Sequence, residues 1–250
     1  MDGWVKSEIK NKVCEITFFH PKGNSLPGIL LAHLIDAIEK ADSDQNANII
    51  LLQSEGEKTF CAGASFDELL GIKDEKSGKK FFMGFAGVLN AMRECSKFIF
   101  ARVQGKAVGG GVGLISAADY TFAVKDAAIK LSELALGIGP FVIGPAVTRK
   151  IGSTAFAELT LNYDWHKSEW ALQKGLYNQI FDSTDEMDEA IKLMSEKLSE
   201  ANPDAVKELK KLFWEGTEDW KELLKRKAEM SGRLVLSEHT KKYIEKFKKR

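Results

Sequence analysis

Three consecutive glycines at positions 109–111 stand between two apolar segments, residues 98–103 (FIFARV) and residues 112–118. The pattern predicts a strand, a tight turn and a helix. Glycine permits positive φ and lets the backbone lie against a ligand. The first amide groups of a helix lack intrahelical partners and carry the positive end of the helix dipole. The turn could therefore hold a developing oxyanion with backbone N–H groups alone.

Glu133 is the best candidate for acid–base chemistry. It lies in the largely apolar segment 129–136, and burial there would raise the pKa of its carboxyl group toward a useful range. The same local sequence also fits an exposed carboxylate at a turn, and neighbouring residues do not decide between the two interpretations. Cys61 is a weaker candidate for a nucleophile, because no histidine lies near it in sequence to activate the thiol.

The elements that must position these groups alternate between strands and helices. Apolar residues at helical spacing predict a helix over residues 27–41, and residues 81–95 are expected to form another. Strands are expected at residues 4–9, 13–19, 49–52, 98–103, 120–124 and 128–131, with a hairpin turn at 10–12 and a short strand leading into 60–64. This alternation predicts an α/β core, to which we assign residues 1–183.

The composition changes after residue 183. Residues 184–201, 203–215 and 217–249 are rich in lysine and glutamate with apolar stripes, and Pro203 and Gly216 mark the breaks between them. We therefore expect a C-terminal region of α-helices over residues 184–250. Its charged faces are expected to be solvated, although the long amphipathic tail could also cover a neighbouring subunit.

Composition and charge exclude several classes of function. The 36 basic residues balance the 36 acidic ones, which gives no electrostatic case for nucleic acid or an anionic membrane as partner. No apolar run is long enough to span a bilayer. Three cysteines, odd in number and far apart, fit reduced thiols in the cytoplasm and show no metal-ligand spacing. We expect no metal and no separate cofactor.

Four segments, in order, resemble the crotonase (enoyl-CoA hydratase/isomerase) superfamily, and the resemblance covers nearly the whole chain. They are residues 21–26 (PKGNSL), 60–66 (FCAGASF), 105–111 (GKAVGGG) and 131–137 (LSELALG). The resemblance implies a crotonase-like core, a superhelix of ββα units with a C-terminal helical layer. It also implies an enzyme that acts on an acyl-CoA substrate, with coenzyme A as part of that substrate.

The resemblance assigns roles to individual residues. The amides of Ala64 and Gly110 would hold the oxygen of a thioester enolate, and Glu133 would transfer the proton. Asp67 and Glu68 could supply another carboxylate, but a role at a helix start or in solvent fits them better. Positions expected to contact the substrate are Lys22, Asn24, Ala62, Phe66, Gly109, Gly113 and Phe141.

One departure from the family pattern concerns the reaction itself. Hydratases of the family that use two glutamates carry the other one where this chain has Gly113. Such enzymes hold one water between two carboxylates, so Gly113 favours a Δ3–Δ2 enoyl-CoA isomerase that uses one base. Hydration and other enolate chemistry stay open. A non-catalytic relative that binds acyl-CoA is the alternative from another class of function.

The C-terminal segment carries a further implication. Tyr243 and Lys246 resemble a family segment that contacts the adenine and phosphates of CoA, often across a subunit boundary. An ordinary basic tail explains Lys246 equally well, because Lys241, Lys242 and Lys248 surround it. The resemblance also suggests a homotrimer or homohexamer, in which residues 184–250 complete the CoA site and take part in oligomerisation.

Overall fold

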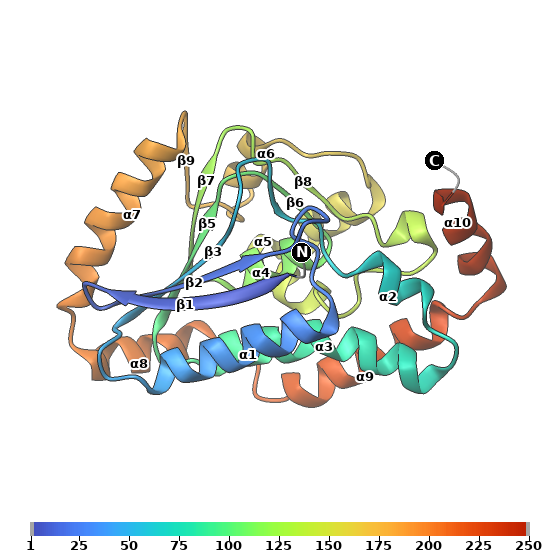
Figure 1. Cartoon of the computed structure of the whole chain (residues 1–250), viewed down its shortest axis with the longest axis horizontal. Helices are drawn as coiled ribbons and strands as arrows, with labels where there is room; N and C mark the ends of the chain where they lie inside the picture. Colours follow the sequence, from blue (N-terminus) through green and yellow to red (C-terminus); the bar gives the residue numbers. More distant parts are fainter. Residues whose placement is uncertain (1–2, 249–250) are drawn as a thin grey trace.

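The computed structural model describes residues 3–248, with the side chains of residues 245–248 excepted. Two sheets and a surrounding set of helices form the molecule (Figure 1). The strands are β1 (Trp4–Lys10), β2 (Val13–Phe19), β3 (Ile49–Ser54), β4 (Thr59–Cys61), β5 (Phe98–Val103), β6 (Lys106–Val108), β7 (Tyr120–Val124), β8 (Ile129–Lys130) and β9 (Gln179–Phe181). The helices are α1 (Gly28–Ser43), α2 (Phe66–Leu70), α3 (Glu75–Glu94), α4 (Gly110–Ala117), α5 (Gly144–Leu161), α6 (Ser168–Gln173), α7 (Thr184–Ser199), α8 (Pro203–Phe213), α9 (Trp220–Leu234) and α10 (Glu238–Lys248), with a 3₁₀ turn at Leu134–Leu136.

The expected hairpin at the N-terminus is confirmed. β1 pairs with β2 antiparallel, and Lys10 faces Val13 across a two-residue loop. Asn11 and Lys12 have φ of 48° and 64°. Positive φ at both loop residues is the geometry of the tight turns that match the natural twist of paired strands.

Successive strands alternate between the two sheets. The larger sheet has the order β1-β2-β3-β5-β7-β9 and the smaller one β4-β6-β8, so the chain visits the smaller sheet after β3, after β5 and after β7. All pairs except β1–β2 are parallel. Because β4 and β6 are parallel neighbours, the segments that follow them emerge side by side. This pairing places the loops after residues 61 and 108 together.

Helices cover the sheets and pack against one another. Figure 1 shows α1 and α3 running below the larger sheet, with α7 along its left side and α10 at the right. α3 and α9 approach backbone to backbone, because a Cβ on Gly78 would lie 2.7 Å from the carbonyl oxygen of Gly232. Two glycines therefore fix the spacing between a helix of the first half and a helix of the last quarter of the chain.

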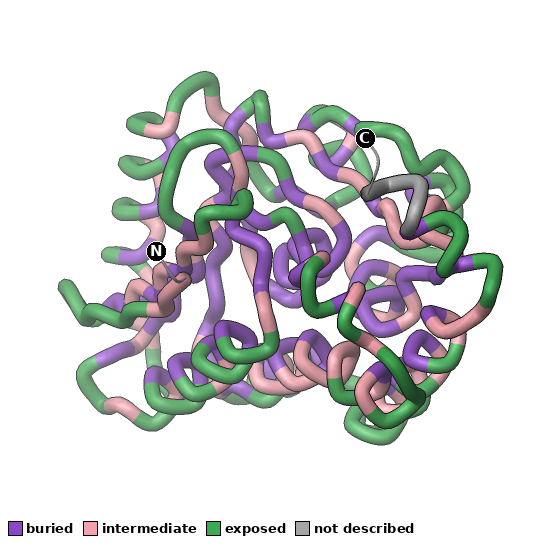
Figure 2. The backbone as a smooth tube through the Cα atoms, turned by 45° about the vertical axis from the view of Figure 1, so that its right-hand side comes forward, coloured by how far each residue is buried: buried purple, intermediate pink, exposed green. Residues whose placement is uncertain are grey.

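The hydrophobic core crosses the boundary expected at residue 183. Buried residues of the strands, such as Ile50 and Phe100, belong to the same cluster as Ile191, Trp220 and Leu224 of the C-terminal helices. Figure 2 shows this buried interior continuing from the sheets into the helices. The C-terminal helices therefore complete the core that the strands begin, and the boundary does not separate two hydrophobic cores.

The structure corrects two of the expected helices. One helix was expected over residues 217–249, but the described part of this segment holds two, α9 and α10. Val235, between them, is buried, and the hydroxyl of Ser237 accepts a hydrogen bond from the Thr240 amide at the start of α10. The helix expected at 81–95 begins earlier, at Glu75, where the N-cap residue Asp74 and Ser77 of the first turn form a capping box.

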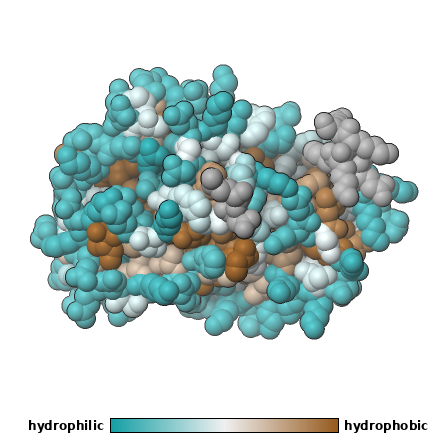
Figure 3. Space-filling view, viewed as in Figure 1, coloured by the Kyte–Doolittle hydropathy of each residue, from teal (hydrophilic) through white to brown (hydrophobic). Residues whose placement is uncertain are grey.

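Polar side chains cover most of the face shown in Figure 3. Among the residues that the structure describes, no helix has the length and apolar character needed to cross a membrane.

A buried ion pair links α8 to the strand region. The Nζ of Lys210 lies 2.8 Å from Oδ2 of Asp119, and the same carboxyl oxygen accepts the Ile99 amide at 2.7 Å. Lys210 also donates to the Met92 carbonyl at 3.3 Å. The two charged side chains are 2% and 6% exposed, so neither charge has water as an alternative partner. Asp119 therefore has a structural position.

We expect Lys210→Met to lower the free energy of unfolding by about 3–5 kcal/mol, because it removes the ion-pair partner of the buried Asp119 carboxylate. Lys211→Met is the matched control, since Lys211 pairs with Glu208 on the exposed face of the same helix, and such pairs contribute about 0–1 kcal/mol. Urea denaturation of both variants measures the difference. Equal losses would contradict the structural importance of the buried pair.

Candidate functional site

Two backbone segments from different parts of the chain meet at the ends of β4 and β6. Gly63, after β4, has φ of 87°, and a Cβ there would lie 2.9 Å from the Val108 carbonyl oxygen and 3.5 Å from the Gly110 nitrogen. A side chain at position 63 would therefore separate the two segments. Gly109 has φ of 52°, and helix α4 begins directly after it. Glycine is needed at both positions, because side chains disfavour this backbone region.

Ala64 and Gly110 both line one cavity. Leu26 pairs with the segment around Ala64 through two backbone hydrogen bonds. The Leu26 amide donates to the Gly63 carbonyl, and the Leu26 carbonyl accepts from the Ser65 amide. The Ala64 amide is left out of this pattern, and Gly110 is the first residue of α4. Within the described part of the chain, neither amide donates a hydrogen bond. Two unpaired donors thus lie in adjacent segments beside the cavity.

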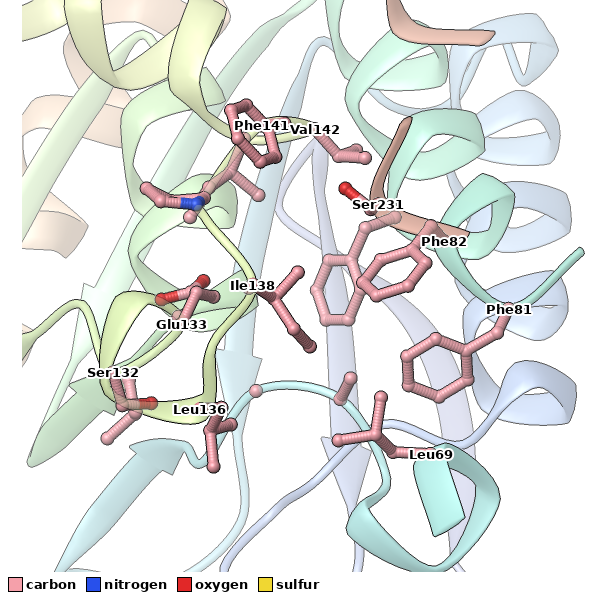
Figure 4. Close-up of a pocket in the computed structure, with 18 of the residues that line it drawn as sticks. Leu69, Phe81, Phe82, Ser132, Glu133, Leu136, Ile138, Phe141, Val142 and Ser231 are labelled. Atoms are coloured by element: carbon pink, nitrogen blue, oxygen red, sulfur yellow. The ribbon is translucent and has the colours of Figure 1, made fainter. Parts of the chain in front are cut away.

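The cavity has a volume of about 190 Å³ and is lined largely by apolar side chains (Figure 4). In that view Glu133 lies at its left, Phe81 and Phe82 at its right, and Leu69 at its lower end. Glu133 is the one ionisable residue among the described residues that line it, and the hydroxyl groups come from serines 65, 132 and 231.

Glu133 is held between the 3₁₀ turn and the glycine turn. A Cβ on Gly109 would lie 2.9 Å from Oε1 of Glu133, so the carboxyl group packs directly on the glycine. Its Oε2 is buried and has no hydrogen-bond partner. Burial raises the pKa of the Glu133 carboxyl from its ordinary value of 4.5 to about 7, although the amides of Glu133 and Ser132 lower it in part. The interpretation of Glu133 as an exposed carboxylate is thereby excluded.

The C-terminal helix supports the segment that carries Glu133. The buried hydroxyl of Thr240, in α10, donates to the Gly137 carbonyl at 2.8 Å. Gly137 has φ of 78° and ends the 3₁₀ turn, and the Ile138 amide donates to the Glu133 carbonyl at 3.0 Å. Residues 238–248 therefore contribute to the position of a carboxyl group more than 100 residues away in sequence.

The structure brings together seven of the residues that the sequence singled out. The cavity is lined by Ala62, Ala64, Phe66, Gly109, Gly110, Glu133 and Phe141. They come from four separate segments of the chain. Residues that the sequence assigned to one site therefore lie around one cavity.

Lys22 and Asn24 do not line the cavity. Asn24 has its polar atoms engaged within the loop: its amide donates to the carbonyls of Glu55 and Thr59, both at 2.8 Å, and its oxygen accepts from His20. Asn24 thus stabilises the loop and has no free group for a ligand there. Lys22 is exposed outside the cavity and pairs with Asp67.

Gly113 also lies outside the cavity lining. It is buried inside α4, and a Cβ there would lie 2.5 Å from Cγ2 of Ile143. Ile143 itself lines the cavity. An isoleucine side chain therefore fills the direction in which a side chain at position 113 would point, and this contact replaces the substrate contact that we expected from Gly113.

Other residues near the first loop have structural roles. The Glu68 carboxyl accepts the Gly28 amide at the start of α1 at 2.8 Å, and Ser65 caps α2 by accepting the Glu68 amide. Neither Asp67 nor Glu68 lines the cavity. The Cys61 thiol is buried and also outside the lining, and burial raises its pKa to about 12. A thiolate nucleophile at this position is excluded at neutral pH.

Tyr243 lies in α10, where its ring is 4.8 Å from that of His239, and it is not part of the cavity lining. Lys246 also belongs to α10, but its side chain lies outside the described residues. The CoA contacts expected of these two residues stay predictions.

The sequence model described as Enoyl-CoA hydratase/isomerase matches residues 8–250. The chain belongs to this family. The crotonase superfamily membership and the α/β fold that the four segments predicted are thereby confirmed, and the family is one of enzymes. Among the described residues, no three histidine, cysteine, aspartate or glutamate side chains are grouped as a metal ion would require.

Relatives in the family carry several activities in their names. A probable enoyl-CoA hydratase of Bacillus subtilis is 27% identical over 94% of this chain and 92% of its own length. A peroxisomal Δ(3,5)-Δ(2,4)-dienoyl-CoA isomerase of Arabidopsis thaliana is 25% identical over 82% of this chain and 80% of its own length. The crystal structure of an enoyl-CoA hydratase from Bacillus halodurans superimposes with a TM-score of 0.90 at 26% identity, covering 97% of this chain and 99% of that one.

Sequence reasoning missed much of the cavity wall. Phe81, Phe82 and Phe85 line it from one face of α3, and Ser231 lines it from α9. The aromatic spacing in α3 was a usable signal, since residues four apart share a helix face. No local signal identified Ser231, because the packing of α9 on α3 is what brings it to the cavity.

We expect Glu133→Gln to be more stable than the parent protein at high pH. The folded-state pKa of about 7 exceeds the ordinary value of 4.5, so the native carboxyl keeps a proton that the unfolded chain releases. Stability therefore falls as pH rises through that window, and glutamine does not titrate. In urea denaturation, the free energy of unfolding of Glu133→Gln should exceed that of the parent protein by on the order of 2 kcal/mol at about pH 8, and this difference should shrink toward about pH 5.

The exposed Glu189→Gln is the control, since Glu189 pairs with Lys192 at the surface of α7. Its free energy of unfolding should not differ from that of the parent protein in a pH-dependent way. A Glu133→Gln protein that is less stable than the parent at both pH values would contradict a destabilising, buried carboxylate at Glu133.

Proposed function

We propose that this protein forms and reprotonates the enolate of an acyl-CoA thioester, with Glu133 as its acid–base group. One observation carries the proposal. A carboxyl group whose pKa is about 7 borders the same apolar cavity as two unpaired backbone amides, those of Ala64 and Gly110. The acyl-CoA substrate is inferred from the family and from the names of its members.

The amides act on the thioester oxygen. In the proposed complex the Ala64 and Gly110 N–H groups donate to this oxygen, which gains negative charge when a proton leaves C2. Backbone donors that are already oriented need no rearrangement during the reaction, and one oxyanion-hole donor typically lowers the barrier by about 2.7–4 kcal/mol. The dipole of α4 adds positive potential at Gly110.

Glu133 moves the proton. As a carboxylate it takes a proton from C2 of a 3-enoyl thioester, and the electron pair delocalises into a dienolate. The protonated carboxyl then delivers that proton to C4, the double bond moves to C2–C3, and the carboxylate is restored. No group is oxidised or reduced, so the reaction needs no cofactor. A pKa near 7 suits a group that must accept and return a proton near neutral pH.

The single carboxyl favours isomerisation over hydration. A two-carboxylate hydratase needs a second acid–base group across the substrate, and the direction from Gly113 is filled by Ile143. Asp67 and Glu68 lie outside the cavity lining. A Δ3–Δ2 enoyl-CoA isomerase is therefore the activity that we propose first, with hydration as the second candidate because relatives are named hydratases.

We further propose that CoA is bound by Lys22 together with Tyr243 and Lys246, and that the active form is a homotrimer or homohexamer. The cavity is too small for a whole CoA ester, so the nucleotide must lie outside it. The cysteines that the structure describes are all free and buried, which supports a reducing compartment such as the cytoplasm.

The activity test compares two substrates of equal chain length. Incubation with a 3-enoyl-CoA should give the 2-enoyl-CoA. Mass spectrometry should show an unchanged mass, and the absorbance of the conjugated thioester follows the rate of the reaction. Glu133→Gln should lower kcat by about 100- to 10,000-fold. Glu68→Gln is the matched control and should retain activity. Water addition to a 2-enoyl-CoA without double-bond migration would refute the isomerase, and CoA-ester binding without any turnover would favour the non-catalytic relative.

The rate should depend on pH through Glu133. Because the carboxylate is the reactive form and its pKa is about 7, kcat/KM for the 3-enoyl-CoA should rise about tenfold per pH unit below neutrality and level off above it. Initial rates from about pH 5 to about pH 9 measure this, with activity recovered at neutral pH as a check on denaturation. A flat profile down to pH 5 would rule out a base with a raised pKa.

A further inference from the structure

A hydroxyl group without a partner borders the cavity opposite Glu133. Ser231, in α9, is 1% exposed, and its Oγ has no hydrogen-bond partner. Figure 4 shows this oxygen directed into the cavity from its upper right edge, with Glu133 on the left. Of the buried side-chain atoms that lack partners in the described chain, only Oε2 of Glu133 and Oγ of Ser231 belong to residues of this cavity.

Two other serines buried in helices satisfy their hydroxyl groups within their own helix. The hydroxyl of Ser116, in α4, donates to the Val112 carbonyl at 2.8 Å, and that of Ser199, in α7, donates to the Glu196 carbonyl at 2.9 Å. This bond to the preceding turn is the common solution for a helical serine. Ser231 makes no such bond, so its hydroxyl retains its capacity to bond a group in the cavity.

The backbone around Ser231 is closely fixed. The next residue, Gly232, lies so near α3 that a Cβ would come within 2.6 Å of the Lys79 amide nitrogen. Phe82, four residues after Gly78 on α3, lines the cavity with Ser231. The contact between Gly78 and Gly232 therefore sets where the hydroxyl stands relative to the aromatic wall.

The remaining lining restricts the chemistry of a partner for this hydroxyl. No lysine, arginine or histidine is found among the described residues that line the cavity. A carboxylate on the ligand would be buried without a cation, and near Glu133, which is strongly unfavourable. A neutral oxygen has no such cost, and a serine hydroxyl can donate to a carbonyl or exchange a hydrogen bond with a hydroxyl.

We propose that Ser231 is a specificity residue that hydrogen-bonds a neutral oxygen function, hydroxyl or keto, on the acyl chain of the substrate. This inference rests on the proposed function, since it takes the cavity as the acyl site. A plain hydrocarbon chain would leave the buried hydroxyl unpaired. An oxygen-bearing chain would satisfy it, so the two classes of acyl group are discriminated by one hydrogen bond.

Binding of saturated CoA esters tests the inference apart from catalysis. Isothermal titration calorimetry compares octanoyl-CoA with hydroxy- and oxo-octanoyl-CoAs that carry the oxygen at successive carbons beyond C4. We expect at least one oxygenated ester to bind the parent protein about tenfold more tightly than octanoyl-CoA. Ser231→Ala should abolish that preference with little change for octanoyl-CoA, and the near-isosteric Ser231→Cys should weaken it strongly.

Ser195→Ala is the matched control. Ser195, in α7, is also buried with an unpartnered Oγ, but it lies outside this cavity, so its loss should leave the preference intact. Equal binding of all esters to the parent protein would overturn the inference, as would a preference that survives in Ser231→Ala. A preference that depends on Ser231 without turnover of any enoyl ester would refute only the proposed function.

Discussion

The parallel pairing of β4 with β6 is the constraint on which the site depends. Cys61 and Ala107 are neighbours in that ladder, so the segments that follow them leave the sheet together. The absence of a side chain at Gly63 then allows the two backbones to approach within contact distance, and Gly109 leaves room for the Glu133 carboxyl group. Because the amides of Ala64 and Gly110 belong to these segments, their separation is set by sheet hydrogen bonds. Such spacing is more rigid than two flexible loops could provide.

The apolar cavity disfavours charge, yet Glu133 must become a carboxylate there in order to accept a proton. Burial raises the pKa of Glu133 to about 7, and its Oε2 has no partner. This arrangement reduces stability when the carboxylate forms, and it gives the group a proton affinity suited to transfer near neutral pH. Apolar residues make up most of the cavity lining around it, and Ile143 fills the space toward Gly113.

The C-terminal helices belong to the site as well as to the core. α9 packs on α3 through Gly78 and Gly232 and brings Ser231 to the cavity, while Thr240 of α10 holds the Gly137 carbonyl beside the segment of Glu133. The same packing explains why 217–249 could not be one straight helix. Val235 is buried in a cluster with Leu69 and Ile138, and the chain bends there to reach the 3₁₀ turn.

Sequence alone predicted many of the elements and the chemical groups of the candidate site. Periodicity identified the N-terminal hairpin and α1, and the glycine turn was recognisable from a few consecutive residues. The role of Glu133 was implied by the resemblance to the family, because its local sequence left two interpretations open. Only the tertiary structure decided which groups share a cavity. It enclosed Glu133, engaged Asn24 in loop hydrogen bonds, directed position 113 at Ile143 and brought Ser231 in from α9. The physical reason is that burial and hydrogen-bond partners are set by contacts between distant segments, which a local pattern does not encode.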